Sequence, residues 1–107
     1  MVNQGDIIRI DFDPQSGHEQ AGRRPALVIS NNYFNRYSSM HMVCPITNKD
    51  KQHAFHIPLG DKTKTSDVIL CDQARILDIK SRNYAFIERL PKEILDKAKN
   101  LLISFVE

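Results

Sequence analysis

The stretch Ile8-Arg9-Ile10-Asp11-Phe12 alternates apolar and charged side chains with a period of two. Successive side chains of a β-strand point to opposite faces of a sheet, so this pattern predicts a strand that is buried on one face. Residues 26–29, Ala-Leu-Val-Ile, form a continuous apolar run, which is typical of a strand covered on both faces. The chain is therefore predicted to begin with β-structure.

Weaker strand signals continue along the chain. Four further candidates are residues 40–46, 55–59, 68–77 and 84–90, of which the third is the longest β-like stretch and the last is the weakest. Pro45 indicates an edge or a bulge near the end of its strand, because proline cannot donate a hydrogen bond to a sheet.

The last segment changes from the period of a strand to that of a helix. Its apolar residues fall on one helical face and its charged residues on the other. The apolar residues are Ile94, Leu95, Ala98, Leu101, Leu102 and Phe105. Pro91 suits the first position of this helix, and Glu93 with Lys97 forms a supportive pair one turn apart.

The predicted elements indicate a mainly β, α+β fold. A turn or two of helix is expected over residues 31–36, with Asn31 or Asn32 as its cap. Several short strands with one closing helix predict a small, partly open β-barrel, strongly curved so that few edges are exposed. At 107 residues, the chain is expected to be one domain, 1–107, with its function on loops and one outer face.

The composition is that of an ordinary globular protein, with 41% hydrophobic and 26% charged residues. The formal net charge of +2 is too small to indicate a nucleic-acid-binding protein, so any phosphate site must be a local cluster. No apolar stretch approaches the roughly 20 residues that a membrane span needs. Charged residues interrupt the isoleucines near the N-terminus, so no secretory signal is recognised and a cytoplasmic location is expected.

Cys44 and Cys71 both lie in apolar runs. They are expected to be buried thiols that act as small hydrophobic side chains, because a chain without an export signal normally keeps its cysteines reduced. One disulfide is the alternative.

Residues 13–25, Asp-Pro-Gln-Ser-Gly-His-Glu-Gln-Ala-Gly-Arg-Arg-Pro, form a long connection between the first two strands. A polar surface loop with solvated charges is the simpler interpretation. The alternative is a phosphate site with acid–base groups beside it, because a guanidinium donates two parallel hydrogen bonds to phosphate oxygens. Arg24, next to Pro25 at the entry to a strand, is the better anchor, and Arg23 is freer.

Residues 17–25 of this connection, Gly-His-Glu-Gln-Ala-Gly-Arg-Arg-Pro, resemble the signature loop G-[SH]-E-Q-x-G-x-R-P of the MazF/PemK/Kid toxins. Further matches follow the family's order along nearly the whole chain. They are Gly5-Asp6-Ile7, Asp11-Phe12-Asp13-Pro14, Ala26-Leu27-Val28-Ile29-Ser30, Pro45-Ile46-Thr47, and Cys71-Asp72-Gln73-Ala74-Arg75 with Ile76-Leu77-Asp78. His18 and the Cys-Asp-Gln run place the chain nearer the PemK/Kid branch.

The resemblance implies an SH3-like β-barrel with helical additions that works as a homodimer. It also implies a toxin that cleaves single-stranded RNA at short sequences, without a metal or other cofactor. The nucleophile in such enzymes is the substrate's own 2′-hydroxyl, which leaves a 2′,3′-cyclic phosphate and a 5′-hydroxyl. The active site must then accept a proton, stabilise the phosphorane and protonate the leaving oxygen.

Arg24 and Thr47 are the first catalytic candidates by resemblance. Arg24 is expected to stabilise the negatively charged phosphorane, since a guanidinium is a reluctant proton donor. Thr47 can offer its hydroxyl to a phosphate oxygen, although on its own it would be taken for a β-branched strand residue.

The general base is left open among Glu19, Asp72 and His18. Glu19 matches the acid of the signature loop, and Asp72 matches a carboxylate assigned to proton transfer in Kid-like members. His18 is a histidine, the residue type whose unperturbed pKa is nearest neutrality. Kid-like members carry an arginine two residues before that aspartate, where this chain has Leu70. A Kid-type Asp/Arg pair therefore does not transfer directly, which favours Glu19 with Arg24.

RNA is expected to be read as a single strand, through stacking on aromatic rings and contacts to base edges. The candidate RNA-binding residues are Gln20, Arg23, Lys49, Lys51, Phe55, Gln73 and Arg75. Residues 48–55 occupy the place of the family's specificity loop, where Lys49 and Lys51 would contact phosphates and Phe55 would stack. A core position for Phe55 is at least as well supported, since it alternates with Ile57 and Leu59.

Other chemistries have weaker support. His53 and His56 are three residues apart, but they precede a strand of alternating side chains and lack a metal-binding motif, so no metal site is expected. Cys71 has no nearby histidine in sequence to activate it as a nucleophile. The main alternative is a non-catalytic protein resembling CcdB, which binds DNA gyrase on the same fold. A degenerate member that only dimerises and binds antitoxin is a third interpretation.

The resemblance also implies a cognate antitoxin. Its flexible acidic C-terminal segment is expected to lie over the RNA-binding surface and to compete for the same cationic groups. Contact with DNA is expected only indirectly, through the complex with the antitoxin, and no contact with a membrane is expected.

Overall fold

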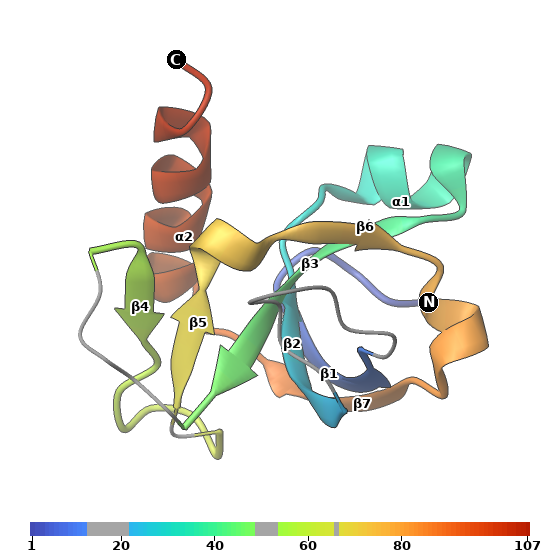
Figure 1. Cartoon of the computed structure of the whole chain (residues 1–107), viewed down its shortest axis with the longest axis horizontal. Helices are drawn as coiled ribbons and strands as arrows, with labels where there is room; N and C mark the ends of the chain where they lie inside the picture. Colours follow the sequence, from blue (N-terminus) through green and yellow to red (C-terminus); the bar gives the residue numbers. More distant parts are fainter. Residues whose placement is uncertain (13–21, 49–53, 66) are drawn as a thin grey trace.

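The structure, a computed structural model, describes residues 1–12, 22–48, 54–65 and 67–107. Its strands are β1 (Asp6–Asp11), β2 (Arg23–Val28), β3 (His41–Thr47), β4 (His56–Pro58), β5 (Val68–Leu70), β6 (Arg75–Leu77) and β7 (Ala85–Arg89). The helices are α1 (Asn32–Ser38) and α2 (Lys92–Ser104), with two short 3₁₀ helices, η1 (Cys71–Gln73) and η2 (Ile79–Arg82). Figure 1 shows these elements in chain order.

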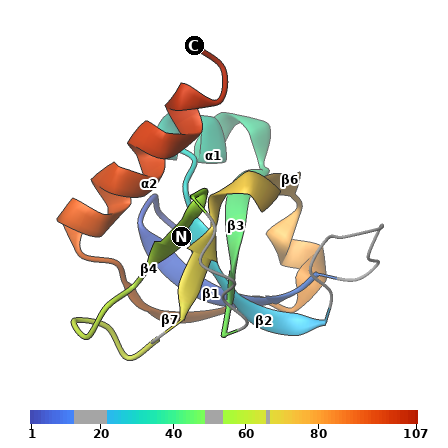
Figure 2. The same ribbon diagram turned by 60° about the vertical axis from the view of Figure 1, so that its left-hand side comes forward.

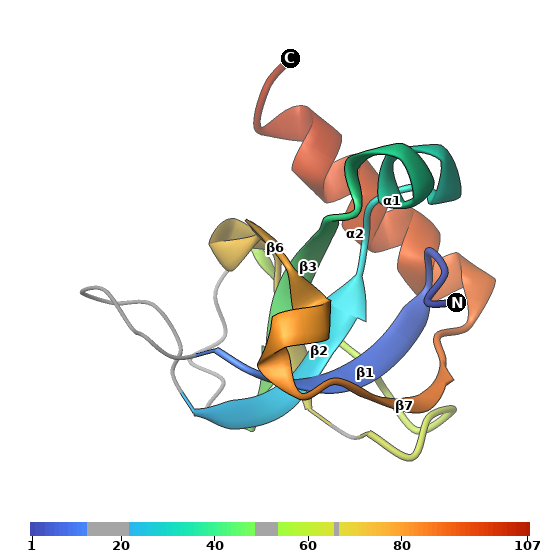
Figure 3. The same cartoon turned by 90° about the vertical axis from the view of Figure 1, so that its right-hand side faces the viewer.

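The strands form one antiparallel sheet in the order β4-β5-β3-β2-β1-β7, with β6 pairing β3 outside this path. Figure 3 shows β1, β2 and β7 curving beneath α1 and α2. The prediction of a mainly β fold with a curved, partly open sheet and a C-terminal helix is confirmed. Among the described strands, β4 and β7 remain the two ends of the sheet order.

The central strand β3 changes its partner at Pro45. On one side Pro45 pairs with Ala26 of β2. On the other side, residues 41–43 pair with β6 and residues 46–47 pair with β5. Of the two alternatives that Pro45 indicated, an edge or a bulge, the edge is wrong, because β3 lies inside the sheet. The missing N–H of Pro45 is accommodated because it falls at the gap between two partners.

The prediction of one long strand over residues 68–77 was also wrong. Opposite Pro45 the chain leaves the sheet as η1 and rejoins it as β6, so the stretch becomes β5, a turn of 3₁₀ helix and a second short strand. A continuous strand would need a hydrogen-bond donor on Pro45, which proline lacks. The other predicted strands are confirmed, with boundaries that differ by a few residues.

Both faces of the sheet carry a hydrophobic core. One core includes Ile8, Ile10 and Phe12, the residues whose alternation predicted the first strand, and all three are fully buried. The other core includes Ile7 and Leu27 and continues into α2. Because neighbouring residues of β1 and β2 enter opposite cores, the apolar run over residues 26–29 is covered on both faces, as predicted.

Helix α2 closes the second core. It contacts β4 and η1 and crosses the sheet beside them (Figure 2). Ala98 is buried, and the leucines around it pack against the core, which confirms the predicted apolar face. Pro91 is the residue before the first helical position rather than that position itself. The ion pair within the helix joins Lys92 to Asp96. None of the described helices is long and apolar enough to cross a membrane.

The first turn of α2 also contacts the connection between β4 and β5. Glu93 accepts a hydrogen bond from Nζ of Lys62 at 3.1 Å, and it keeps a favourable electrostatic interaction with Lys97, its predicted partner within the helix. The connection between β4 and β5 is thereby tied to the first turn of the helix.

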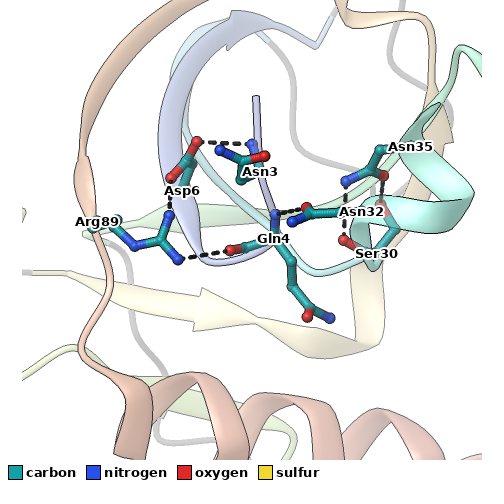
Figure 4. Close-up of polar contacts among 7 residues, drawn as sticks. All are labelled: Asn3, Gln4, Asp6, Ser30, Asn32, Asn35 and Arg89. Atoms are coloured by element: carbon teal, nitrogen blue, oxygen red, sulfur yellow. Dashed lines mark hydrogen bonds and ion pairs between the residues drawn. The ribbon is translucent and has the colours of Figure 1, made fainter. Parts of the chain in front are cut away.

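A polar network holds the N-terminal turn against β7 and α1 (Figure 4). The buried Asp6 carboxylate accepts bonds from Arg89 Nη1 at 3.0 Å and from the Asn3 N–H at 2.8 Å. Gln4 N–H donates to Asn32 Oδ1 at 2.8 Å. The side chain of Asn31 caps α1 by accepting from Phe34 N–H, which selects Asn31 over its neighbour as the cap.

Cys44 and Cys71 are both free and buried, as the sequence predicted. The break in the strand at η1 places Cys71 against Cys44 of β3, and their thiols share a hydrogen bond. This bond raises the pKa of Cys44 well above its ordinary value and lowers the pKa of Cys71.

Substitution of Gly5 is expected to destabilise the fold more than the same substitution at Gly60. Both glycines have positive φ, +92° and +76°, which costs about 1–2 kcal/mol for an alanine. At Gly5 an added Cβ would also lie 3.1 Å from Leu95 Cδ2, whereas at Gly60 nothing lies within 4 Å. Urea unfolding followed by circular dichroism measures both free energies. An equal loss for Gly5→Ala and Gly60→Ala would show that the α2 contact is unimportant.

Candidate active site

Arg24 and Thr47 meet at one end of the sheet. Arg24 lies in β2 and Thr47 ends β3, and both lie on the face that also carries Ala26 and Val43. Nη1 of Arg24 lies 3.4 Å from Oγ1 of Thr47, at the long end of hydrogen-bonding distance. Thr47 is 3% exposed and Arg24 is partly buried, so a guanidinium is held beside a hydroxyl that has little freedom.

The backbone holds the ends of the connection between β1 and β2 beside this pair. The N–H of Phe12 donates to the carbonyl of Gly22 at 2.9 Å, which joins the residues on either side of the segment 13–21. Gly22 has a φ of +78°, a conformation that side chains other than glycine rarely adopt. The chain enters β2 directly afterwards, so Arg23 and Arg24 are placed by this closure.

Further arginines surround the same point. Arg75 Nη1 donates to the carbonyl of Phe12 at 3.3 Å, and its guanidinium lies 6.0 Å from the centre of the Phe12 ring. Arg82 Nη1 donates to the carbonyl of Asp11 at 3.1 Å. Arg23 Nη1 donates to the carbonyl of Asn83 and lies 3.6 Å from Asp11 Oδ1. A local cationic cluster therefore exists although the net charge is only +2.

Asp72 and Gln73 lie in η1, beyond the far end of β5 from Thr47. Thr47 pairs with Val68, and the chain continues through Leu70 into η1. Asp72 therefore lies roughly 10 Å from Thr47 along the sheet. Oδ1 of Asp72 lies 3.2 Å from Nε2 of His56. The structure thus joins Asp72 to a histidine and joins Arg24 to Thr47.

Phe55 lies between the two positions predicted for it, an exposed stacking residue and a core residue. Its side chain is 41% exposed, and its ring packs edge-on against Phe105 at 5.1 Å between centroids. Leu59 is fully buried and Ile57 is packed against the core, so Phe55 is the least buried residue of the alternating set. It has an exposed surface but also a structural contact.

Several predicted site residues lie outside the described part of the chain. They are His18, Glu19, Gln20, Lys49 and Lys51, together with His53. Within the described ranges, no group of three or more histidine, cysteine, aspartate or glutamate side chains is arranged to hold a metal ion.

No pattern in the sequence points to the contacts of two residues of this region. His56 was considered only as a metal ligand, and its contact with Asp72 depends on the pairing of β4 with β5. Arg82 belongs to no recognisable motif, and its bond to the Asp11 carbonyl joins residues 71 positions apart. Neither contact is encoded by a local spacing.

Comparison with known proteins places this geometry in context. Residues 3–106 match the family described as PemK-like, MazF-like toxin of type II toxin-antitoxin system. The chain is 38% identical to the endoribonuclease toxin ChpB of Escherichia coli, over 97% of this chain and 93% of that protein. It is 35% identical to the endoribonuclease PemK of Escherichia coli, over 90% of this chain and 75% of that protein.

Solved structures agree with these relatives. The crystal structure of MazF from Deinococcus radiodurans superposes with a TM-score of 0.91 at 34% identity, covering 98% of this chain and 96% of that one. A MazE-MazF crystal structure from the same organism superposes with a TM-score of 0.84, also at 34% identity, over 98% and 95% of the two chains.

Proposed function

The chain belongs to the PemK-like, MazF-like toxins of type II toxin–antitoxin systems, and on this basis we propose that Arg24 and Thr47 form the centre of its active site. The protein is an endoribonuclease toxin that an antitoxin neutralises. The contact between the Arg24 guanidinium and the Thr47 hydroxyl is the observation that carries the assignment of the site.

Arg24 stabilises the phosphorane in this proposal. A phosphodiester gains negative charge on its non-bridging oxygens as it becomes pentacoordinate, and a fixed cation lowers the energy of that state. The guanidinium is held by a strand on one side and by the Thr47 contact on the other, so it needs little rearrangement to receive the phosphate. Thr47 donates its hydroxyl to a second phosphate oxygen.

The substrate's 2′-hydroxyl is the nucleophile. Its oxygen attacks the adjacent phosphorus, the bond to the 5′-oxygen breaks, and the products carry a 2′,3′-cyclic phosphate and a 5′-hydroxyl. One group must accept the 2′-hydroxyl proton and another must protonate the departing oxygen. Glu19, His18 and Asp72 remain the candidates for these two roles, and no metal ion is required.

Single-stranded RNA binds across the cationic cluster. Arg23 and Arg75 belong to this cluster and can contact the RNA backbone or base edges, and Gln73 in η1 extends the proposed contacts along the sheet. Gln20, Lys49 and Lys51 extend the proposed contacts, and the exposed part of the Phe55 ring offers a stacking surface.

The antitoxin competes with RNA for this surface. A flexible acidic segment presents carboxylates where RNA presents phosphates, so the arginine cluster can bind either one. Because the RNA substrate is messenger RNA, the toxin acts in the cytoplasm, inhibiting translation and growth. DNA is contacted only through the antitoxin.

Substitution of Arg24 is expected to remove most of the cleavage activity without unfolding the protein. Loss of a fixed charge-stabilising group typically lowers kcat about 10²–10³-fold. Thr47→Val keeps the shape of the side chain but removes its hydroxyl, and a loss of about tenfold is expected for one neutral hydrogen bond. Initial rates on a fluorogenic RNA, with circular dichroism of each variant, measure both effects.

Arg36→Ala is the matched control, because Arg36 is an exposed arginine of α1 and lies outside the cluster. It is expected to cleave at the rate of the unmodified protein. Full activity of Arg24→Ala would exclude the proposed centre.

A single 2′-deoxy sugar at the cut site is expected to block cleavage there, since it removes the nucleophile. The cut site is first located by sequencing the 5′-ends of a digested long RNA, and the substituted oligonucleotide is then compared with its all-ribose counterpart in EDTA. The products of the all-ribose RNA should accept phosphate from polynucleotide kinase directly. Cleavage of the deoxy substrate would contradict the mechanism, and an intact long RNA would favour a gyrase-binding toxin.

The proposed homodimer is supported by an apolar surface at the end of α2. We define this C-terminal apolar surface as Met42, Leu102, Ile103, Phe105 and Val106, which line one depression together with Cys71, Asp72 and Ala74. Ile103 is 50% exposed and Val106 is 86% exposed. Apolar side chains gathered on one surface favour burial against another protein chain. Among the described strands, β6 pairs with β3 alone, so its outer edge adjoins the same region.

Ile103→Asp is expected to dissociate the homodimer, because a carboxylate would have to be buried without a partner. Sedimentation equilibrium at micromolar concentration should give one chain for this variant and two for the unmodified protein. Phe86→Asp changes an apolar residue on β7 that is 61% exposed, and it should leave the dimer intact. A monomeric unmodified protein, or a dimeric Ile103→Asp variant, would contradict the proposal.

A further inference from the structure

Asp72 is held by a residue from a different part of the chain. Nε2 of His56, at the start of β4, lies 3.2 Å from Oδ1 of Asp72 in η1. The His56 side chain is 14% exposed and that of Asp72 is 35% exposed. The imidazole is thus largely enclosed, whereas the carboxylate still reaches the surface.

The fold fixes this contact from both sides. His56 pairs with Leu70, the last residue of β5, and the chain then turns into η1. The N–H of Cys71 donates to the carbonyl of Phe55 at 3.2 Å. The residues immediately before His56 and immediately before Asp72 are therefore tied together, so the two side chains start from adjacent backbone positions.

The neighbour of His56 is the position at which this chain departs from the Kid-like pattern. Where that pattern has an arginine, Leu70 is 2% exposed and cannot contact a charged group through its side chain. Opposite residues in an antiparallel pair have Cβ atoms about 4.5–5.5 Å apart. A histidine opposite Leu70 can therefore bring a nitrogen donor to the aspartate from the next strand.

We infer that His56 is a positioning residue for Asp72 in RNA cleavage. With its proton on Nε2, His56 donates to Oδ1 and fixes the orientation of the carboxylate, which leaves Oδ2 for the RNA. A carboxylate held in one orientation loses less freedom when it meets its substrate. His56 itself does not contact the RNA in this arrangement and acts through Asp72.

This inference rests on the proposed function and goes beyond it, because it names the residue that holds the Asp72 carboxylate in the orientation in which it meets the RNA. It also explains how Asp72 can take part in RNA cleavage although the chain has Leu70 in place of the Kid-type arginine. The partner comes from β4 through strand pairing, instead of from two residues earlier in the chain.

The test compares His56→Gln with His56→Leu. The two side chains are similar in size, but only glutamine keeps an N–H donor that can reach Oδ1. His56→Leu is expected to lower kcat about tenfold or more with a smaller change in KM, and His56→Gln to recover most of that loss. Asp72→Asn should also lower kcat, and His56→Leu should add little to it in the double variant.

Lys62→Ala is the matched control. It removes an ion pair of similar length, Lys62 to Glu93 at 3.1 Å, from an exposed position, and should leave cleavage unchanged. Circular dichroism and urea unfolding show whether each variant is folded. If His56→Leu unfolds, His56→Ala, which also lacks the N–H donor, takes its place in the comparison with His56→Gln.

The outcomes separate this inference from the proposed function. Full activity of Arg24→Ala would overturn the proposed function whatever His56 does. If Arg24→Ala is inactive while folded His56→Leu matches the Lys62→Ala control, only the role of His56 is overturned. Equal losses in folded His56→Leu and His56→Gln, full activity of Asp72→Asn, or additive losses in the double variant would also overturn it.

Discussion

The missing N–H of Pro45 is the constraint on which the arrangement of the site depends. Pro45 lies in β3, the strand that pairs on both sides, at the one point where its neighbour changes from β6 to β5. Because proline cannot donate there, the opposing chain is free to leave the sheet as η1. That departure places Cys71 against Cys44 and brings Asp72 to the surface beside His56.

The sheet positions the site because both of its faces are buried. Adjacent residues of β1 and β2 enter different cores, so neither strand can shift by one residue without exposing apolar side chains. Towards the end of the sheet, the side chains on one face change from the apolar Ala26 and Val43 to the polar Arg24 and Thr47. The polar groups of the site are therefore fixed by the packing behind them, which is the condition for electrostatic stabilisation of a transition state.

The arginines of this region divide into two kinds of role. Arg75 and Arg82 donate to the backbone carbonyls of Phe12 and Asp11, where they hold the end of β1. Arg24 instead lies beside the hydroxyl of Thr47, the last residue of β3. A chain with a net charge of +2 can thus bind a polyanion locally, because its cations converge from β2, β6 and η2 on one short segment.

The sequence by itself determined the features that local patterns control. Period-two alternation identified β1, an apolar face identified α2, and an asparagine at the cap position identified α1. The resemblance of the loop before Pro25 indicated the family that the comparisons confirm. Only the tertiary structure decided where the stretch over residues 68–77 breaks, because the cause of the break lies on β3. Only the tertiary structure decided which side chain holds Asp72. Such contacts join residues distant in sequence through strand register, and no spacing along the chain records that register.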